Sequence, residues 1–356
     1  MKNNIHTIMR NMMTHRVLTI SLLTTLWLGL GAPLTTGAEP SRQGTVGAQF
    51  LKIGVGARYL AMGEAAVASK GDAFSMYWNP AAMTETEGQQ IGFAHTDWLL
   101  DVTLNYIAYQ RRFEGKGVLG VAMTSMSVPK MEITTVDEQE GTGQSYDASS
   151  FALQVGFARE LTPRFSFGGA AKYVHERIFR ETSSAIAFDF GTMLYTGFRT
   201  LRLGMNISNL GGDVRYDGPN LTTNVNDNTN DNGVTDPSSP DVGARLLVES
   251  YSLPLTFRVG MGYDWEFNAG SRLTMAAEMK HPNDAQQQGS LGMEYGWHER
   301  FFLRSGYKFQ YDEQGLTLGG GIMTPIFGDT EMGIDYAWSD FGRLSSAHRF
   351  SVTMGF

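Results

Sequence analysis

The last eleven residues of the chain alternate between apolar side chains and polar or small ones. Read as an extended strand from Ser346 to Phe356, this segment has one apolar face, formed by Phe350, Val352, Met354 and Phe356. Such a period of two is typical of a β-strand, and here it continues to the final residue. If the apolar face lies against lipid, both strand edges must be paired, because an open sheet edge is not tolerated there. The terminus therefore predicts a closing strand and, upstream, a barrel for it to close.

An apolar row that ends on a terminal aromatic residue also resembles the C-terminal strand through which bacterial outer-membrane proteins are recognised and inserted. The start of the chain agrees with export. Three cations precede an apolar run from Val17 to Leu30, and Thr36 to Ala38 supply the small residues of a signal-peptidase site. The run is shorter than the roughly 20 residues of a spanning helix. We predict a signal peptide over residues 1–38.

The composition excludes several function classes. The formal net charge is −8, and it becomes −11 without Lys2, Arg10 and Arg16, which argues against a nucleic-acid partner. Because the chain has no cysteine, it has no disulfide, thiol nucleophile or thiolate metal site. A mean hydropathy of −0.21 excludes a helical membrane bundle, whereas 42% hydrophobic residues and 42 glycines suit strands that are apolar on one face only.

Fourteen segments with strand periodicity follow residue 90, and an even number is typical of single-chain bacterial barrels. Most approach the roughly 9 to 11 residues that a tilted strand needs to cross a membrane. We predict an all-β fold, a transmembrane antiparallel up-and-down β-barrel of about 14 strands over residues 91–356. The segments are Ile91–Asp97, Val102–Arg112, Gly117–Ser127, Ser149–Arg159, Phe165–Arg177, Ala185–Tyr195, Leu201–Ser208, Pro254–Trp265, Ser271–Lys280, Gly289–Gly296, Phe301–Phe309, Leu316–Met323, Thr330–Trp338 and Ser346–Phe356.

A soluble sandwich with one wet face would show the same alternation, and two further features favour the barrel. Every second connection is short, as periplasmic turns are, while the others include the two long ones, residues 128–148 and 210–253. These two are therefore predicted to be extracellular loops. Aromatic pairs at predicted strand ends resemble the girdles found at membrane interfaces. The pairs are Tyr263 with Trp265, Tyr295 with Trp297, and Tyr336 with Trp338.

The segment before the first strand, residues 39–90, does not alternate like the rest. Small and apolar residues from Ala57 to Ala68 predict a short helix, which Gly71 would end. Further on, the Asn79-Pro80 dipeptide predicts a turn on a packed loop.

This segment carries a resemblance to a known family. The sequence GARYLAMGEAAVASKGDAFSMYWNPAAM, Gly56 to Met83, resembles the N-terminal segment of the PorV/PorQ family and, more distantly, of the FadL-type hydrophobic-compound transporters. In these families a glycine-rich stretch precedes an Asn-Pro-Ala motif and a fourteen-stranded barrel. Glu64 and Ala82 stand where glycine is common. The resemblance implies that residues 39–90 form a hatch inside the barrel, with Gly56, Gly63, Asn79, Pro80 and Ala81 as its motif residues.

Many charged residues fall on the strand face opposite the apolar row and would point into the barrel lumen, where lipid does not penalise them. We favour an ion-pair lattice that packs the lumen and holds the hatch. The alternative is that some of them line a pore and tune what passes. The residues are Lys172, Asp189, Arg258, Asp264, Glu278, Lys280, Glu294, Arg304, Lys308, Glu331 and Asp335.

Neither a metal site nor a catalytic site is predicted, and no cofactor is expected. The loop of residues 210–253 is rich in Asn, Asp, Ser and Pro and has part of the oxygen spacing of a calcium loop, but Asn replaces most carboxylates and Ser239 stands where an EF-hand has Glu. The histidines are scattered outside any catalytic motif, and His95 with Asp97 is a close His/carboxylate pair at a strand end. The loop residues concerned are Asn228, Asn230, Asn232, Gly233 and Asp236.

Two functions remain, both in the outer membrane of a bacterial cell and surrounded by its lipid. The PorV/PorQ resemblance implies a binding and shuttle component of type IX protein secretion, with secreted cargo proteins and secretion-machinery subunits as partners. The FadL-type resemblance implies passive transport of apolar small molecules past the hatch. A structural barrel with neither activity is a third possibility. We favour the first because the chain is short for a FadL-type transporter and its motif is closer to PorV/PorQ.

Overall fold

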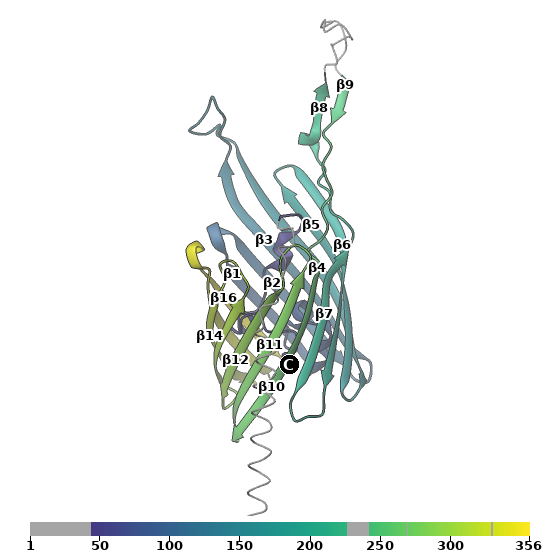
Figure 1. Cartoon of the computed structure of the whole chain (residues 1–356), viewed down its shortest axis with the longest axis vertical. Helices are drawn as coiled ribbons and strands as arrows, with labels where there is room; N and C mark the ends of the chain where they lie inside the picture. The colour runs from purple at the N-terminus through teal and green to yellow at the C-terminus, as the bar shows by residue number, and fades with distance from the viewer. Residues whose placement is uncertain (1–43, 226–241, 269, 329) are drawn as a thin grey trace, which may run out of the picture. The chain divides into compact units, whose positions relative to one another are not determined.

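A computed structural model describes residues 44–225, 242–268, 270–328 and 330–356 (Figure 1). The predicted signal peptide, residues 1–38, lies outside the described residues. So do the residues weighed for calcium, Asn228 to Ser239.

Fourteen antiparallel strands of the described chain close into one barrel, as predicted. Each strand pairs with the next one along the chain, β7 pairs with β10, and β1 closes the ring against β16. The strands are β1 (Gln89–Asp97), β2 (Thr103–Phe113), β3 (Gly117–Glu132), β4 (Ser145–Thr162), β5 (Phe165–Ile178), β6 (Glu181–Tyr195), β7 (Arg202–Gly211), β10 (Thr256–Asn268), β11 (Ser271–Pro282), β12 (Gln288–Trp297), β13 (Phe301–Phe309), β14 (Leu316–Phe327), β15 (Thr330–Asp340) and β16 (Ser346–Gly355).

The C-terminal strand closes the barrel with the predicted face outward. Phe350 is 49% exposed on the outer wall, whereas its neighbour Ser351 is buried in the lumen. Phe350 lies opposite His95 of β1. The backbone of Phe356 exchanges two hydrogen bonds with Gln89, so the pairing continues to the last residue. No edge is left open to lipid, which is what a membrane-spanning sheet requires.

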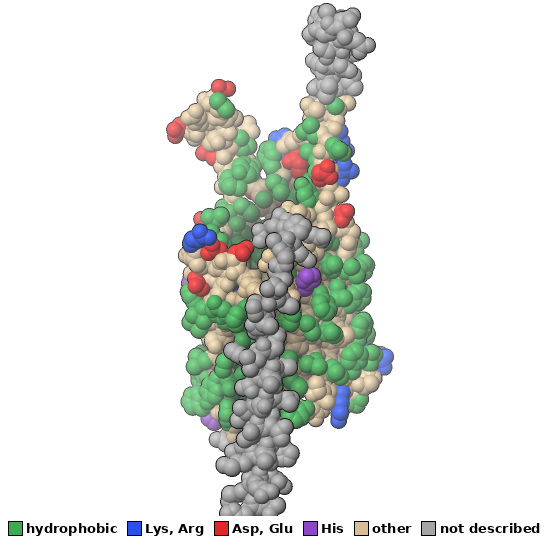
Figure 2. Space-filling model, in the orientation of Figure 1, with side chains coloured by type: hydrophobic (Ala, Val, Ile, Leu, Met, Phe, Trp, Pro, Cys, Tyr) green, Lys and Arg blue, Asp and Glu red, His purple; other side chains and the backbone are tan. Residues whose placement is uncertain are grey.

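Alternation along each strand reflects two different environments. On β4, the outward side chains of Leu153, Val155 and Phe157 are about half exposed, while Ala152 and Ala158 are buried inside. Hydrophobic side chains cover much of the barrel wall visible in Figure 2. Because the outer face contacts lipid and the inner face contacts protein, apolar residues satisfy the first and small or polar residues the second.

Several strands are longer than the alternation predicts. β3, β4, β6 and β7 extend at the end that carries the long connections, called here the long-loop end, whereas β10 and β14 extend at the opposite end. β3 and β4 stay paired as far as Glu132 and Ser145, beyond the apolar belt, where alternation is not required. The connection after β7 contains an unpredicted hairpin, β8 (Thr222–Val225) with β9 (Val242–Arg245). The extended β3–β4 hairpin and the connection between β7 and β10, which contains β8 and β9, are called here the two arms. Both arms project from the same end of the barrel (Figure 1).

The predicted helix over Ala57 to Ala68 is wrong beyond its first turn. Helix α2 (Ala57–Ala61) ends before Gly63 and Glu64, which both have left-handed backbones with φ of +67° and +66°. Consecutive left-handed residues cannot continue a right-handed helix. Further short helices are α3 (Ser75–Trp78) and the 3-10 helices η1 (Gln49–Lys52), η2 (Pro80–Glu85), η3 (Leu99–Asp101), η4 (Pro219–Leu221) and η5 (Gly342–Leu344). None of the described helices is long and apolar enough to cross a membrane.

Candidate functional site

The segment before β1 lies inside the barrel and fills much of its lumen. This luminal segment, residues 46–86, begins at the long-loop end, where the Gly47 amide donates to the Ser252 carbonyl oxygen at 3.0 Å. It ends at the opposite end, where the guanidinium of Arg112 donates to the carbonyl oxygens of Thr84 and Thr86. It thus runs through the barrel from one end to the other.

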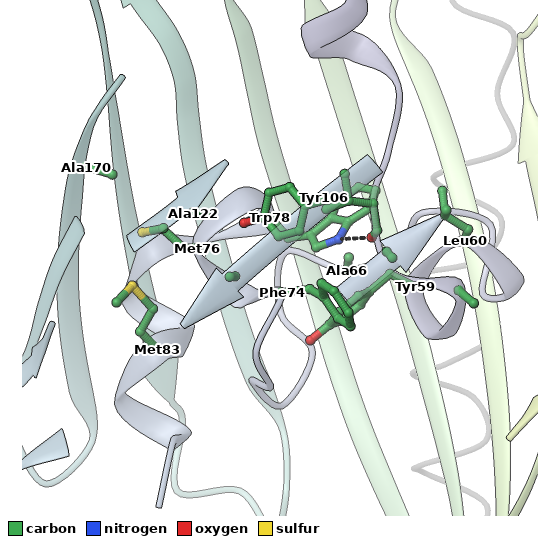
Figure 3. Close-up of a cluster of buried hydrophobic side chains, with 14 of the residues drawn as sticks. Tyr59, Leu60, Ala66, Phe74, Met76, Trp78, Met83, Tyr106, Ala122 and Ala170 are labelled. Atoms are coloured by element: carbon green, nitrogen blue, oxygen red, sulfur yellow. Dashed lines mark hydrogen bonds between the residues drawn. The ribbon is translucent and has the colours of Figure 1, made fainter. Parts of the chain in front are cut away.

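Aromatic packing forms the centre of the luminal segment (Figure 3). The Trp78 ring lies 5.7 Å from the Tyr59 ring, and its indole N–H donates to the Val55 carbonyl oxygen at 2.9 Å. Phe74 packs against Tyr106 of β2 with ring centroids 5.9 Å apart. All these rings are buried, so the segment and the barrel wall share one hydrophobic core.

The Asn79-Pro80-Ala81 motif ties the segment together and to the wall. The Asn79 side-chain oxygen accepts from the Ala81 amide at 3.1 Å, which caps η2. Its side-chain nitrogen donates to the Val67 carbonyl at 2.7 Å and to the Thr192 carbonyl of β6 at 3.0 Å. Pro80 takes the first helical position, where its missing N–H costs nothing. One fully buried side chain thus joins two parts of the segment to a strand.

The two motif glycines have positive φ angles, and one of them lies directly against the backbone of the barrel wall. Gly56 and Gly63 have φ of +80° and +67°, which favour glycine. A Cβ on Gly63 would lie 3.0 Å from the Leu291 oxygen and the Tyr307 nitrogen, both of them barrel backbone atoms. The segment therefore touches the wall without intervening side chains at this point.

Inward-facing glycines of the barrel form a seat that fits the luminal segment. A Cβ on Gly191, Gly204, Gly292 or Gly306 would overlap atoms of Asn79, Val67, Met62 or Gly63 respectively. Gly92, Gly120, Gly156, Gly168 and Gly319 are also too close to the segment to carry a Cβ without a shift. Because these glycines lie on strands all around the barrel, the segment is enclosed from every side by backbone.

Barrel side chains also bind the backbone of the luminal segment. The Glu278 carboxylate accepts from the amides of Ala66 and Val67, both at 2.8 Å. On other strands, Asn206 donates to the Trp78 carbonyl at 2.8 Å, and Arg202 donates to the Ala68 carbonyl at 3.1 Å. Such bonds satisfy backbone groups that helix or sheet pairing leaves free.

The predicted luminal charges are, with one exception, on the inner face and paired. Lys172 binds Asp189 at 2.8 Å, and the Arg258 guanidinium binds Glu278 at 3.1 Å while stacking on Trp78. Lys172 and Asp189 form a cluster apart from the others, with Gln154 and Asn209. Glu331 is exposed at a strand end. The geometry is that of an ion-pair lattice.

The densest part of this lattice surrounds two carboxylates. Glu294 accepts from Arg304 at 2.6 Å, from Arg58 at 3.0 Å and from Arg272 at 3.1 Å. Asp264 binds Arg202 at 2.7 Å and Lys70 at 3.1 Å. Sequence reasoning missed Arg58, Lys70, Arg202 and Arg272. For Arg202, the strand periodicity could have found it, because it shares a face with Gly204 and Asn206.

Glu64 is a charged residue of the luminal segment that faces the long-loop end. Its carboxylate binds the Lys308 ammonium group closely and the Lys280 ammonium group at 4.0 Å. Burial by itself would raise the pKa of Glu64, but these two cations lower that pKa to about 2. Glu64 is therefore ionised.

A cavity of about 380 Å³ opens above the luminal segment at the long-loop end. We call it the mouth pocket. One wall is apolar and is formed by Phe50, Ile53, Trp98, Val102, Met126 and Val128; the other is polar and includes Lys52, Glu64, Lys280, Tyr311 and Gln314.

Comparison with known families decides the assignment. The family model described as "Type IX secretion system protein PorV" matches residues 36–236, more than half of the chain. The chain belongs to the PorV family. No curated protein matches it. PorV membership and the closed barrel place the protein in the bacterial outer membrane.

Three solved structures that share this barrel fold are described as transporters or channels. The Pseudomonas putida toluene transporter TodX has a TM-score of 0.54 at 12% identity, covering 85% of this chain and 97% of that one. The monoaromatic hydrocarbon channel CymD has a TM-score of 0.53 at 13% identity, with 85% and 98% covered. The Ralstonia pickettii toluene transporter TbuX has a TM-score of 0.52 at 11% identity, with 85% and 97% covered. At these identities the likeness concerns the fold.

The close His95/Asp97 pair of this PorV-family chain lies outside the luminal ion-pair lattice. The His95 ring contacts Asp97 at 3.0 Å and Asn105 at 2.7 Å, on the outer face at a strand end. Within the described ranges, no group of three or more His, Cys, Asp or Glu side chains is arranged to hold a metal. The family and the fold are those of transport and secretion barrels rather than enzymes.

Replacing Asn79 with alanine should lower the stability of the barrel. The change leaves the buried carbonyls of Val67 and Thr192 without their donor, and each such loss costs about 1–3 kcal/mol. The measurement is the free energy of unfolding in detergent, with heat-modifiable migration used to monitor unfolding. Asn220→Ala, at an exposed loop position, serves as control and should change it by less than about 0.5 kcal/mol. Equal effects of the two changes would argue against a role for the motif.

Proposed function

We propose that this protein is a binding and shuttle component of type IX secretion, which receives secreted cargo at the cell surface and passes it to the surface-attachment machinery. The observation that carries the proposal is the PorV family match over residues 36–236. The luminal segment supports it, because a lumen filled by a buried, ion-paired segment leaves the ends of the barrel as the surfaces for partners.

The two arms at the long-loop end are the proposed cargo-binding surface. They are placed outside the cell by the usual orientation of outer-membrane barrels, which have short periplasmic turns and long extracellular loops. Both carry apolar side chains outside the lipid-facing belt, such as Val136, which is 89% exposed, and Leu247, which is 84% exposed. Exposed apolar groups beyond the membrane favour a protein partner.

The domain organisation is part of this proposal. Residues 1–38 would be removed as a signal peptide, residues 39–90 would form a hatch, and residues 91–356 would form the barrel. The seat of glycines and the bonds to Glu278 and Asn206 support a hatch that remains in place.

Shortening one arm tests the cargo role. Replacing residues 133–144, the connection between β3 and β4, with two glycines should abolish copurification of proteins with a type IX sorting domain. The reason is that the change removes the tip of this arm, including Val136, and leaves the closed barrel intact. Heat-modifiable migration checks the fold. Pro163→Ala, in the short β4–β5 turn, serves as control and should leave cargo recovery unchanged. Full recovery with the shortened arm would refute this arm as the binding surface.

A second candidate is passive transport of apolar small molecules, favoured by the apolar wall of the mouth pocket. Uptake of a labelled hydrocarbon by cells with the wild-type protein, compared with cells that lack it, tests this function. Asn79→Ala tests the hatch as its gate, because the residue joins the luminal segment to β6. Unchanged uptake in both comparisons would exclude it.

A further inference from the structure

Exposed charges are unevenly distributed around the end of the barrel opposite the long-loop end, called here the short-turn end. Exposed cations are concentrated where β2 to β7 reach this end, on the strands and in the turns that join them. They are Arg111, Lys116, Arg159, Arg164 and Arg199, and we call them the basic rim. Because β2 to β7 are neighbouring strands, these cations share one half of the barrel circumference.

No residue of the basic rim forms an ion pair with another residue of the described chain. The nearby Arg112 and Glu160 bind each other at 2.9 Å, so neither changes the charge of the rim. The described exposed carboxylates without an ion pair in this half are Glu114, in the β2–β3 turn, and Glu87, before β1. The basic rim therefore has more cations than the surrounding carboxylates can neutralise.

The other half of the short-turn end has the opposite balance. Over β10 to β15, the described exposed charges without an ion pair are one cation, Arg300, and two carboxylates, Glu266 and Glu331. Arg272 and Glu299 bind each other at 3.0 Å. The excess of positive charge is thus confined to one side of the barrel.

Two cations of the basic rim lie on the lipid-facing wall. Arg159 is on the outer face of β4 between Phe157 and Leu161, which are 49% and 59% exposed. Arg111 is on the outer face of β2, and its guanidinium group lies 5.3 Å from the centre of the Phe113 ring. Apolar side chains next to each cation favour the boundary between acyl chains and headgroups, where long cationic side chains reach toward the polar layer.

The register brings Arg111 and Arg159 to the same region of the wall. Arg111 is opposite Leu119 of β3, and Leu119 is opposite Phe157 of β4, two residues before Arg159. The two strands that carry the arginines are separated by β3 alone, which corresponds to roughly 10 Å. Arginine side chains are long enough to approach a common anion across this distance, and the guanidinium group matches the geometry of phosphate oxygens.

We propose that the basic rim binds the phosphate group of an anionic phospholipid in the periplasmic leaflet of the outer membrane. The usual orientation of such barrels places short turns in the periplasm, so Arg111 and Arg159 lie at the headgroups of that leaflet. Phe157 and Leu161 contact the acyl chains. An anionic headgroup neutralises the excess charge of the rim, whereas the ammonium group of a zwitterionic headgroup is repelled by it. The site does not rest on the proposed role in secretion.

Quenching by brominated lipids tests the site. The probe is phosphatidylglycerol with brominated acyl chains, mixed with phosphatidylethanolamine in nanodiscs that contain the full mature protein. Phe113→Trp places a reporter beside Arg111. At this reporter we expect phosphatidylglycerol to bind at least about threefold more tightly than equally brominated phosphatidylethanolamine. The ratio should fall to about one when Arg111→Gln and Arg159→Gln are added, and also at high salt, because salt screens exposed charges.

The two halves of the barrel provide the controls. Trp265 and Trp297 lie on the outer wall of the other half, and without the reporter their quenching should show no preference for phosphatidylglycerol. Arg300→Gln, an exposed arginine of that half, should leave the ratio at the reporter unchanged. Heat-modifiable migration reports the folding of every variant. An unchanged ratio in the double arginine variant, or the same ratio in both halves, would overturn the proposal. So would the absence of any preference at the reporter, which would instead favour an acidic protein as the partner of the rim.

Discussion

A conducting barrel is the expected result of replacing Gly292 with valine. A Cβ at this position of β12 would overlap the Met62 carbonyl oxygen and lie 2.8 Å from the Met62 Cβ. Overpacking costs about 1–3 kcal/mol even where side chains can move, and here the obstacle includes backbone. The luminal segment must therefore shift away from β12. We expect ion conductance in planar bilayers where the wild-type protein shows none.

The matched control is Gly289→Val, three residues earlier on the same strand and on the opposite face. The nearest heavy atom to a Cβ at this position is the Phe309 Cβ at 3.8 Å, which is ordinary van der Waals contact, so the added side chain meets no obstacle there. This variant should stay closed. If the Gly292 variant also conducts no ions, the luminal segment can accommodate a side chain on β12. The inward-facing glycines are then not required for the segment to block the lumen. A leaky wild-type protein would contradict a filled lumen directly.

The largest loss of stability is expected for Glu294→Gln. The carboxylate is fully buried and is the shared counter-charge of Arg58, Arg272 and Arg304. A neutral amide leaves these guanidinium groups close together without that charge. Removing one partner of a buried ion pair costs about 3–5 kcal/mol. Because Arg58 belongs to the luminal segment, the variant should also loosen that segment. The free energy of unfolding in detergent measures the loss of stability. The protease sensitivity of residues 46–86 measures the loosening of the luminal segment.

Glu299→Gln is the appropriate comparison, since Glu299 also binds Arg272, at 3.0 Å, but is 53% exposed. Exposed ion pairs contribute about 0–1 kcal/mol, so this variant should behave almost like wild type. Similar losses in the two variants would mean that burial of the Glu294 cluster does not matter to stability.

The seat and the lattice together explain why the lumen can be closed without covalent links. Glycines let the segment approach the wall, and the Asn79 side chain, the Glu278 carboxylate and the Glu294 cluster fix it at separate points. Each fixing group satisfies buried backbone or charge that would otherwise be unpaired. A transport function would have to release all of them, whereas a binding function needs none to move.

The sequence by itself determined the barrel, because the information for it is local. Alternation with a period of two gives the face of each residue, and connection lengths give the order of long and short loops. This was enough to place Arg258, Glu278 and Arg304 on one face and Phe350 on the other. The Asn79-Pro80 dipeptide predicted a turn, and the structure has the start of the 3-10 helix η2 at this place.

Only the tertiary structure decided which groups meet. The partners Arg58 and Glu294 are 236 residues apart, and no local pattern relates them. Helix α2 ends at Ala61, and the contact of Gly63 with β12 and β13 contributes to this as much as propensity does, since small apolar residues continue to Ala68. The mouth pocket likewise depends on packing across the closed barrel, whereas the β8–β9 hairpin forms a separate two-stranded sheet. Strand faces are set by nearest neighbours along the chain, whereas contacts in the lumen are set by closure, which brings distant segments together.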